Sequence, residues 1–221
     1  MARARGKFLT IEGLDGCGKS TQLGRLAELL RAQGHEVVLT REPGGTPAGE
    51  KIRGVILDSR TSGLSPRAEL ALMFAARAQH IDEVIRPALE AGRFVLCDRF
   101  TDSSEAYQGG GRKLGSEVVL ALHRELCRGL QPDLTILMDS EVEASVARAR
   151  RRNLAREGAS EQDENRFEQE SRAFFQRVRD AYLAIARREP GRVFVVDARR
   201  PADVVHPEIV AEVKKRLSLK N

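Results

Sequence analysis

The chain has few cysteines and histidines. Its 221 residues include three cysteines, Cys17, Cys97 and Cys127, which are odd in number, widely separated and without C-x-x-C spacing. This pattern argues against a disulfide framework and against a cysteine zinc site, and it favours reduced thiols. The four histidines form no spaced metal-binding pair, so we expect them to be surface residues or residues satisfied by neighbours.

Membrane and export signals are also lacking. No stretch is long and apolar enough to span a bilayer. Arg3, Arg5 and Lys7 resemble the basic start of a signal peptide, but the apolar run 8–11 that follows them is too short. With 41% hydrophobic and 31% charged residues, the composition is typical of a globular protein. We therefore expect one domain over residues 1–221, in the cytoplasm and without a membrane partner.

The positive charge is concentrated in one segment. The net charge is +5 and the sequence pI is near 9.4, and the excess gathers at Arg148, Arg150, Arg151, Arg152 and Arg156. No aromatic residues alternate with these arginines, as they would in a base-stacking platform for nucleic acid. The segment therefore favours small phosphorylated ligands, and we expect no nucleic-acid partner.

A glycine-rich stretch near the start matches the G-x-x-x-x-G-K-[ST] phosphate loop in full. An apolar run at 7–12 precedes it and apolar residues at helical spacing follow it, which is the strand, loop and helix setting that the motif requires. Backbone N–H groups of such a loop cradle the α- and β-phosphates of a nucleotide, Lys19 reaches the β/γ oxygens, and the Ser20 hydroxyl can hold Mg²⁺. The alternative is a glycine-rich turn that matches by chance. The stretch reads Gly13-Leu14-Asp15-Gly16-Cys17-Gly18-Lys19-Ser20-Thr21.

Strand and helix patterns alternate along the rest of the chain. Further strands are expected at 36–40, 94–97, 134–138 and 193–196, and helices at about 48–57, from Ser65-Pro66 onward, near 117–127, at 167–188 and at 202–217, with Pro207 as an open question. The polar, glycine-rich passage 107–112 is expected to connect elements. This alternation predicts an α/β fold with a five-stranded parallel sheet, helices on both faces, and ligands beyond the carboxyl ends of the strands.

The phosphate loop alone does not name the reaction. A GTPase would need an N-K-x-D run and an ABC-type ATPase a signature such as L-S-G-G-Q, and the sequence contains neither. Arg41 and Arg99 each follow a predicted strand, where they could hold the phosphate of a second nucleotide. A phosphomonoester is already an anionic nucleophile at neutral pH and needs cations to hold it in line. These features favour a kinase with a phosphorylated acceptor. Surface ion pairs remain the alternative for either arginine.

Three predicted strands end in an aspartate. These residues are Asp98, Asp139 and Asp197. Each would lie at the ligand-binding edge of the sheet, so any of them could be the acidic partner for Mg²⁺. Spacing alone does not choose among them.

Four further motifs, together with the phosphate loop, resemble the thymidylate kinase family over nearly the whole chain. The resemblance implies the P-loop nucleoside-monophosphate-kinase fold, transfer of the γ-phosphoryl group of Mg·ATP to dTMP to give dTDP and ADP for dTTP biosynthesis, and a homodimer. Another nucleoside monophosphate kinase, for UMP or CMP, is the alternative. A non-enzymatic nucleotide switch or a nucleic-acid-binding ATPase is a third reading. The motifs are Thr40-Arg41-Glu42-Pro43-Gly44-Gly45-Thr46, Asp98-Arg99-Phe100, Ala106-Tyr107-Gln108-Gly109-Gly110-Gly111-Arg112 and Arg166-Phe167-Glu168-Gln169-Glu170.

The resemblance also implies roles for individual residues. The ATP site it implies comprises Gly13, Leu14, Asp15, Gly16, Cys17, Gly18, Lys19, Ser20, Thr21, Asp197 and Ala198, although Thr21 reads only as helix by pattern. Ser20 and Asp98 would hold Mg²⁺. The dTMP site it implies comprises Asp15, Arg41, Pro43, Phe74, Arg77, Arg99, Ser104, Tyr107 and Gln108. Lys19, Arg99, Arg148 and Arg152 are implied as catalytic.

Within the dTMP set, the resemblance implies specific contacts. Arg99 and Arg41 would clamp the phosphate, and Pro43, which is often cis in the family, would aim Arg41 inward. Phe74 would stack on thymine, and Arg77 would read its carbonyl edge. By periodicity alone Phe74 reads as a core residue, although its i to i+3 spacing does give it a helix face in common with Arg77.

The remaining dTMP contacts concern the sugar and the far side of the base. The resemblance implies that Tyr107 and Gln108 close over sugar and base, with Tyr107 disfavouring a ribose 2′-hydroxyl. Asp15 would accept a hydrogen bond from the 3′-hydroxyl.

The arginine-rich segment resembles the mobile lid of the bacterial class of this family, an insertion at about 148–166. In that class the phosphate loop lacks an arginine, as at Gly16 here, and the lid supplies it. Arg148 and Arg152 are the candidates, and either would neutralise charge on the transferred phosphoryl group. By pattern alone the segment could also be a solvated basic helix face.

Overall fold

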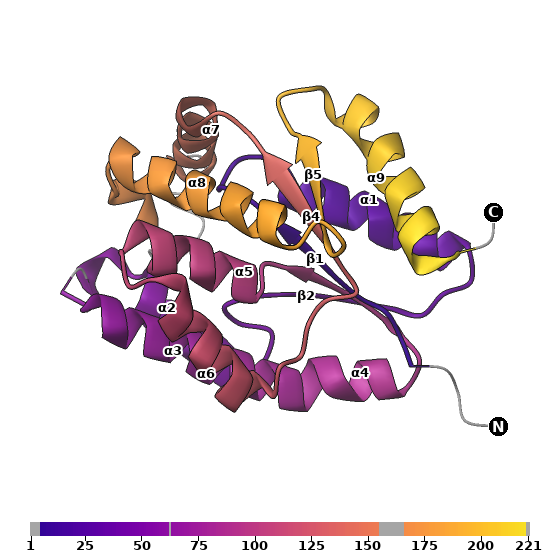
Figure 1. Cartoon of the computed structure of the whole chain (residues 1–221), viewed down its shortest axis with the longest axis horizontal. Coiled ribbons are helices and arrows are strands. Elements are labelled where there is room, and N and C mark those ends of the chain that lie inside the picture. The colour runs from indigo at the N-terminus through magenta and orange to yellow at the C-terminus, as the bar shows by residue number, and fades with distance from the viewer. Residues whose placement is uncertain (1–4, 62, 155–165, 220–221) are drawn as a thin grey trace.

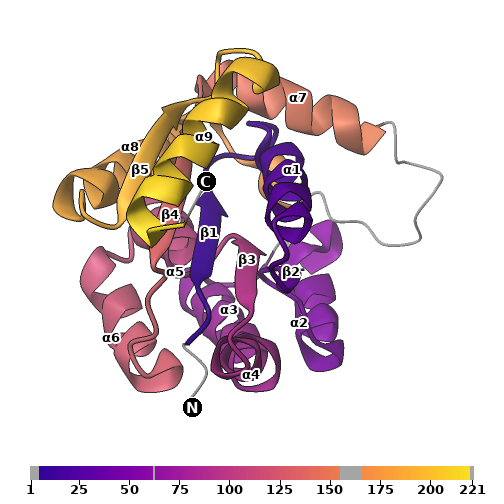
Figure 2. The same ribbon diagram turned by 90° about the vertical axis from the view of Figure 1, so that its right-hand side faces the viewer.

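Five parallel strands form the central sheet of the computed structural model, which describes residues 5–61, 63–154 and 166–219. Across the sheet the strands lie in the order β2-β3-β1-β4-β5 (Figures 1 and 2). All neighbouring pairs are parallel, so the predicted sheet is confirmed and the carboxyl ends of the strands share one edge. The strands are β1 (Phe8–Glu12), β2 (Val37–Arg41), β3 (Phe94–Asp98), β4 (Leu134–Asp139) and β5 (Val193–Asp197).

Helical segments connect the strands. In the described residues, no helix has the length and apolar character needed to cross a membrane. The segments are α1 (Lys19–Ala32), α2 (Pro47–Leu57), η1 (Ser59–Thr61), α3 (Pro66–His80), η2 (Ile81–Ile85), α4 (Arg86–Glu90), α5 (Thr101–Ser104), η3 (Glu105–Gly111), α6 (Ser116–Cys127), α7 (Val142–Leu154), η4 (Phe167–Gln169), α8 (Arg172–Arg188) and α9 (Ala202–Leu217).

The helices cover both faces of the sheet, as predicted. α1 and α9 lie on one side and α3, α4 and α6 on the other (Figure 2). Leu26 and Ile209 belong to the first layer and share a core cluster with Ile11 of β1. Phe74 and Phe100 belong to the second, and α8 contributes a third apolar cluster on β4 and β5. Burial on both faces explains why the strands read as continuous apolar runs.

Residues 107–111 of the passage 107–112 are helical, which corrects the prediction of a connecting passage. α5 continues without a break into the π-helix η3. A Cβ at Gly110 would lie 2.7 Å from the Ala181 Cβ, and one at Gly111 would lie 2.6 Å from the Phe174 ring. These glycines therefore allow η3 to pack closely against α8 rather than making a turn.

The helix predicted at 167–188 begins later than expected. Residues 167–169 form the short 3₁₀ segment η4, and α8 starts at Arg172. The Ser171 hydroxyl accepts a hydrogen bond from the Phe174 N–H at 3.2 Å, and this cap sets the new start. Pro207 lies within α9, and the helix continues past it to Leu217.

Helix α3 begins where the sequence predicts and forms part of a longer helical run. The Ser65 hydroxyl accepts a hydrogen bond from the Ala68 N–H at 3.2 Å, and Pro66 is the first helical residue. The run then continues through η2 and α4 as far as Glu90. This long run carries two of the predicted site residues, Phe74 and Arg77.

Candidate functional site

The phosphate loop joins β1 to α1 at the carboxyl edge of the sheet. Gly13, Gly16 and Gly18 have φ angles of 134°, 79° and 98°, a region that strains residues with a side chain. A Cβ at Gly13 would lie 2.6 Å from the carbonyl oxygen of Met138. α1 begins at Lys19, so its N-terminus and the unpaired N–H groups there form one end of the loop. The loop thus has the backbone form that binds phosphate groups.

Two cations meet at one carboxylate beside this loop. The Lys19 ammonium is buried, lies 3.6 Å from Asp15 Oδ1, and donates to two loop carbonyl oxygens at 3.1 and 2.9 Å. Arg99, the residue after β3, donates to the same Asp15 oxygen at 2.9 Å and to the Tyr107 hydroxyl at 3.2 Å. Burial lowers the pKa of Arg99, but Asp15, Tyr107, Tyr182 and Asp98 together more than offset this, so the pKa is raised and the guanidinium stays charged.

A buried acid supports Arg99 from below. The second terminal nitrogen of Arg99 donates to the hydroxyls of Ser103 and Tyr182 at 3.0 and 3.1 Å. Both hydroxyls also contact Glu12 Oε2, at 2.5 and 3.1 Å, and the Phe100 N–H donates to Glu12 Oε1 at 2.7 Å. Burial raises the pKa of Glu12 to about 7. Glu12, the last residue of β1, is therefore linked through these hydroxyls to Arg99, the residue after β3.

Among the three strand-end aspartates, Asp98 differs from the other two. The Ser20 hydroxyl donates to Asp98 Oδ2 at 3.3 Å, and Asp98 Oδ1 is buried without a hydrogen-bond partner. Asp139 instead accepts two hydrogen bonds from Arg179, at 2.7 and 2.9 Å. Asp197 accepts two from the Arg199 guanidinium, at 2.7 and 2.9 Å, and one from the Arg199 N–H at 3.1 Å. A hydroxyl next to an unsatisfied carboxylate oxygen is a suitable pair of ligands for a hard divalent cation.

Helix α7 brings the arginine-rich segment over the phosphate loop. Arg148 Nε donates to the carbonyl oxygen of Gly16 at 2.7 Å. A Cβ at Gly16 would lie 2.4 Å from the Ser145 carbonyl oxygen, so α7 occupies the space that a side chain at this position would need. The side chain of Arg152 and residues 155–165 lie outside the described part of the chain, and so does most of the predicted lid.

Arg41, at the end of β2, is paired with an acid of α2. It donates to Glu50 Oε2 of α2 at 2.9 Å, and its side chain is 53% exposed. The peptide bond between Glu42 and Pro43 is cis, as the resemblance implies. Arg41 pairs in register with Asp98 across β2 and β3. Glu50 holds the guanidinium in the described structure, and the contact of Arg41 with the acceptor phosphate stays a prediction.

Phe74 and Arg77 lie on α3 facing the interior. The Phe74 side chain has no exposed surface and packs in the core with Phe100, while the Arg77 guanidinium lies 4.7 Å above its ring. The ring is covered by protein atoms in the described structure, as the core interpretation expects, and its stacking on thymine stays a prediction. Arg77 donates to Glu42, to the Phe100 carbonyl oxygen and to Ser104 at 2.6, 3.1 and 3.0 Å. Its remaining nitrogen, Nη1, is buried without a partner.

Gln108 is held by a buried carboxylate. Its Nε2 donates to Glu69 Oε1 at 2.8 Å, and its Oε1 is buried without a partner. Gln108 lies on η3 and Arg77 on α3, two elements that are in contact. This region therefore offers one unsatisfied donor, on Arg77, and one unsatisfied acceptor, on Gln108.

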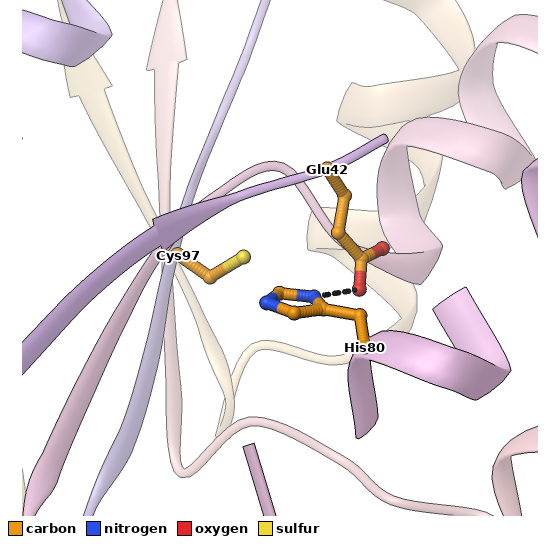
Figure 3. Close-up of side chains that lie close together, drawn as sticks. All are labelled: Glu42, His80 and Cys97. Carbon is orange, nitrogen blue, oxygen red and sulfur yellow. Dashed lines mark hydrogen bonds and ion pairs between the residues drawn. The ribbon is translucent and has the colours of Figure 1, made fainter. Parts of the chain in front are cut away.

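A further cluster of metal-ligand residue types lies beneath the site (Figure 3). One ligand atom each from Glu42, His80 and Cys97 lie within 4.8 Å of one another. Every one of them is engaged, because His80 bonds Glu42 at 2.9 Å and Thr40 at 2.6 Å, and the Cys97 thiol donates to a backbone carbonyl at 3.1 Å. Burial also raises the pKa of Cys97. The cluster therefore acts as a brace for Glu42, which in turn holds Arg77.

The other predicted nucleotide contacts lie at the edge of the site. Thr21 is exposed on α1, and Cys17 is buried, which raises the pKa of its thiol. The Ala198 N–H donates to the Asp139 carbonyl oxygen at 2.8 Å, and Asp197 is paired with Arg199, which lowers the pKa of its carboxyl to about 2. The backbone N–H of Ala198 is therefore already used within the fold.

The sequence reading missed several buried polar residues. Glu12, Glu69 and Tyr182 each form two or more hydrogen bonds to predicted site residues or their supports. An acid on the buried side of a helix, at 69 with 73, 76 and 80 on the same stripe, is a signal that could have identified Glu69. Glu12 is an acid at the end of an apolar strand, next to Gly13, and that position could have identified it as a buried acid.

Comparisons with known proteins point to one family. A family model described as Thymidylate kinase matches residues 11–209. The chain is 51% identical over 198 residues to the thymidylate kinase of Desulfovibrio desulfuricans, covering 90% of each chain. It is 47% identical over 213 residues to that of Methylococcus capsulatus, covering 96% of this chain and 97% of the relative. A crystal structure of thymidylate kinase from Ehrlichia chaffeensis is similar, with a TM-score of 0.73 and 32% identity over 95% of this chain and 99% of the other.

Proposed function

Since the chain belongs to the thymidylate kinase family, we propose that it transfers the γ-phosphoryl group of ATP to dTMP, giving dTDP and ADP. The observation that carries this proposal is the meeting of Lys19 and Arg99 at Asp15. One cation comes from a phosphate loop and the other from a neighbouring strand end. Two cations from different elements that meet at one carboxylate suit a reaction between two phosphorylated ligands.

The donor half of the site would bind ATP through backbone groups. The phosphate loop and the N-terminus of α1 would hold the phosphates, and Lys19 would leave Asp15 to contact the β/γ oxygens. Arg148 lies on the loop already, bonded to the Gly16 carbonyl oxygen. From there it would neutralise charge that develops on the transferred group, with Arg152 as the second candidate of the lid.

Ser20 and Asp98 would hold Mg²⁺ beside the phosphates. The unsatisfied buried oxygen of Asp98 next to the Ser20 hydroxyl supports this choice over Asp139 and Asp197. Bound Mg²⁺ would supply charge neutralisation at the donor phosphates.

The acceptor half would bind the dTMP phosphate with Arg99. The acceptor phosphate is an anion and needs no base, so the task of the protein is to hold it in line with the donor. Asp15 would then be released from Arg99 and would accept from the sugar 3′-hydroxyl, with Tyr107 beside the sugar. Arg41 would join the phosphate only by exchanging its partner Glu50.

The base-binding end favours thymine over cytosine. Arg77 has an unsatisfied donor and Gln108 an unsatisfied acceptor, and the Watson–Crick edge of thymine presents a carbonyl acceptor next to the N3–H donor. Cytosine presents an amino donor and an N3 acceptor, so the same two groups would oppose it. A site built to pair with specific polar groups rejects a ligand that leaves them unpaired. Ser104, which accepts from Arg77, would hold this arginine in position.

An acceptor panel tests the proposal. A coupled assay with ATP should give the highest kcat/KM for dTMP, with dUMP next and dCMP, UMP, CMP and AMP well below. A preference for UMP or CMP would contradict the proposed acceptor. Hydrolysis of ATP that depends on DNA and not on dTMP would contradict the proposed reaction class.

We also propose that the enzyme is a cytoplasmic homodimer. Val55 of α2 and Val118 and Leu126 of α6 are 47%, 40% and 46% exposed, and α3 contacts both of these helices. Exposed apolar residues gathered on neighbouring helices suit a second copy of the chain. The three cysteines are buried and free, as suits a reducing compartment. Sedimentation at micromolar concentration should give the dimer mass, and a monomer would contradict the assembly.

A further inference from the structure

The carboxylate of Glu69 is the centre of a buried polar cluster that joins four segments. Glu69 has no exposed surface. It accepts from Gln108 of η3 at 2.8 Å, from Arg112 at 3.0 to 3.2 Å, and from Arg166 at 2.5 Å. Arg112 also donates to Glu170, before α8, at 2.5 Å. Two guanidinium groups donate to one carboxylate, so both oxygens of Glu69 serve as acceptors.

This carboxylate decides which way the Gln108 amide faces. An amide has a donor end and an acceptor end, and only the donor end can meet a carboxylate that accepts on every side. The reverse orientation would bring two oxygens together in a buried site, which is costly. Gln108 therefore directs Nε2 at Glu69, and its Oε1 is the end of the amide that does not face Glu69. That oxygen is buried and has no hydrogen-bond partner.

We propose that Glu69 determines base specificity as a positioning residue, by locking Gln108 with its acceptor toward the base. The inference rests on the proposed function, in which Gln108 faces the base of the acceptor nucleotide. A locked acceptor pairs with the N3–H of thymine or uracil and repels the N3 lone pair of cytosine. Glu69 itself does not touch the base, because Gln108 lies between them.

A single isosteric change at Glu69 should reverse the orientation of the Gln108 amide. In Glu69→Gln, the two arginines retain the new amide oxygen, so the amide nitrogen of residue 69 faces Gln108. Gln108 then turns its oxygen toward residue 69 and presents a donor to the base. The ratio of kcat/KM for dTMP to that for dCMP should fall at least about tenfold, because the preferred base edge is exchanged. Loss of a merely structural contact would lower both values alike.

Glu105→Gln is the matched control. Glu105 lies on η3, as Gln108 does, and like Glu69 it is buried. It is paired with Arg188 at 2.6 and 2.8 Å. It loses the same charge but does not contact Gln108 in the described hydrogen bonds. Its dTMP to dCMP ratio should equal that of the wild type, and Gln108→Leu should show how much of the ratio depends on the amide at all.

The double variant Glu69→Gln/Gln108→Glu restores the acceptor by a different route. The amide at 69 donates to one oxygen of the new carboxylate at 108, and the other oxygen faces the base. The net charge of the cluster is kept, so this variant serves if Glu69→Gln alone does not fold. Selectivity for dTMP over dCMP should return to within about threefold of the wild type, and isothermal titration of both nucleotides should give the same order of affinities.

The outcomes separate the two proposals. An unchanged ratio in Gln108→Leu would mean that Gln108 does not face the base, and the assignment of the dTMP site would fail. A lowered ratio in Gln108→Leu with an unchanged ratio in Glu69→Gln would leave that assignment standing and overturn the role of Glu69. A double variant that folds and prefers dCMP would overturn it as well.

Discussion

The two halves of the site are built from different materials. The donor half is a single stretch of backbone, residues 13–20, whose shape is set by glycines with positive φ. The proposed acceptor half consists of buried side chains from two segments, with Arg77 on α3 and Tyr107 and Gln108 on η3, each held by a carboxylate or by an arginine. A backbone cradle can hold any nucleoside triphosphate, whereas fixed side-chain donors and acceptors select one base.

The halves also differ in how much of their hydrogen bonding is complete. In the described structure, Lys19 and Arg99 both bond to Asp15, so the cations that would serve two ligands share one internal anion. At the base-binding end, Arg77 and Gln108 each keep one atom unpaired. We infer that phosphate binding works by exchange of partners, while base binding fills vacant hydrogen bonds.

The largest effect is expected at the donor half. Lys19→Ala removes the cation that would stabilise charge on the transferred phosphoryl group, so kcat should fall by at least about 10³-fold. The coupled assay at saturating ATP and dTMP measures this. Arg31→Ala, an exposed cation at the other end of α1, is the control and should retain activity. Near-normal turnover in Lys19→Ala would contradict the assignment of the phosphate loop as the donor half of the site.

Arg99 tests whether the acceptor half is separate from the donor half. Arg99→Ala keeps the residues of the phosphate loop and Lys19, but it removes one contact of Asp15 and the proposed charged partner of the dTMP phosphate. The value of kcat/KM for dTMP should fall by about 100-fold, as expected for loss of a charge-assisted hydrogen bond, while KM for ATP changes little. Arg99→Lys keeps the charge but loses the planar set of guanidinium donors, so its kcat/KM for dTMP should lie between those of the wild type and Arg99→Ala. Equal losses for both substrates would argue for a purely structural arginine.

The same contrast explains what the sequence could reveal. The donor half is contiguous, so its spacing alone identifies it, and the strand-end positions of Arg41, Asp98 and Arg99 follow from the parallel sheet. The choice of Asp98 depends on the partners of Asp139 and Asp197, which lie on α8 and beyond β5. The bond between Glu69 and Gln108 joins residues 39 positions apart. Asp197 and Arg199 are two positions apart, but the pairs of Asp139 with Arg179 and of Glu69 with Gln108 arise from packing and leave no local pattern. The same holds for the helical form of 105–111.

Glu12 joins the two halves and should make stability depend on pH. Its pKa is raised from 4.5 to about 7 by burial and by Asp102, so between these values the folded state keeps a proton that the unfolded chain has lost. The free energy of unfolding should therefore fall as pH rises through this window, by about 3 kcal/mol from this group. Glu12→Gln cannot ionise and should lack this part of the slope.

Urea titrations of the two proteins at pH 5 and pH 8 measure this difference. Other groups titrate in the same range, but they are common to both proteins and cancel in the comparison. Parallel pH profiles would show that Glu12 does not carry a raised pKa in the folded enzyme.

The smallest effect is expected at Tyr107, within the acceptor half. Its ring is 6% exposed and packs edge-on against Phe167 and Phe174, and its hydroxyl contacts Arg99 and Asp15. If the ring screens the 2′ position of the sugar, Tyr107→Ala should raise the ratio of kcat/KM for UMP to that for dUMP by about tenfold, since one excluded hydroxyl is worth on the order of 1 to 2 kcal/mol.

Tyr107→Phe separates the ring from the hydroxyl. It keeps the aromatic packing and should keep the wild-type preference for the deoxyribose sugar, with only a modest loss of turnover from the missing contact to Arg99. Tyr107→Ala also opens a cavity that costs about 3 kcal/mol of stability, so both variants are assayed below their unfolding temperature. A relaxed sugar preference in Tyr107→Phe would assign the screening to the hydroxyl, and acceptor selection at the sugar would then depend on the same network that holds Arg99 rather than on shape alone.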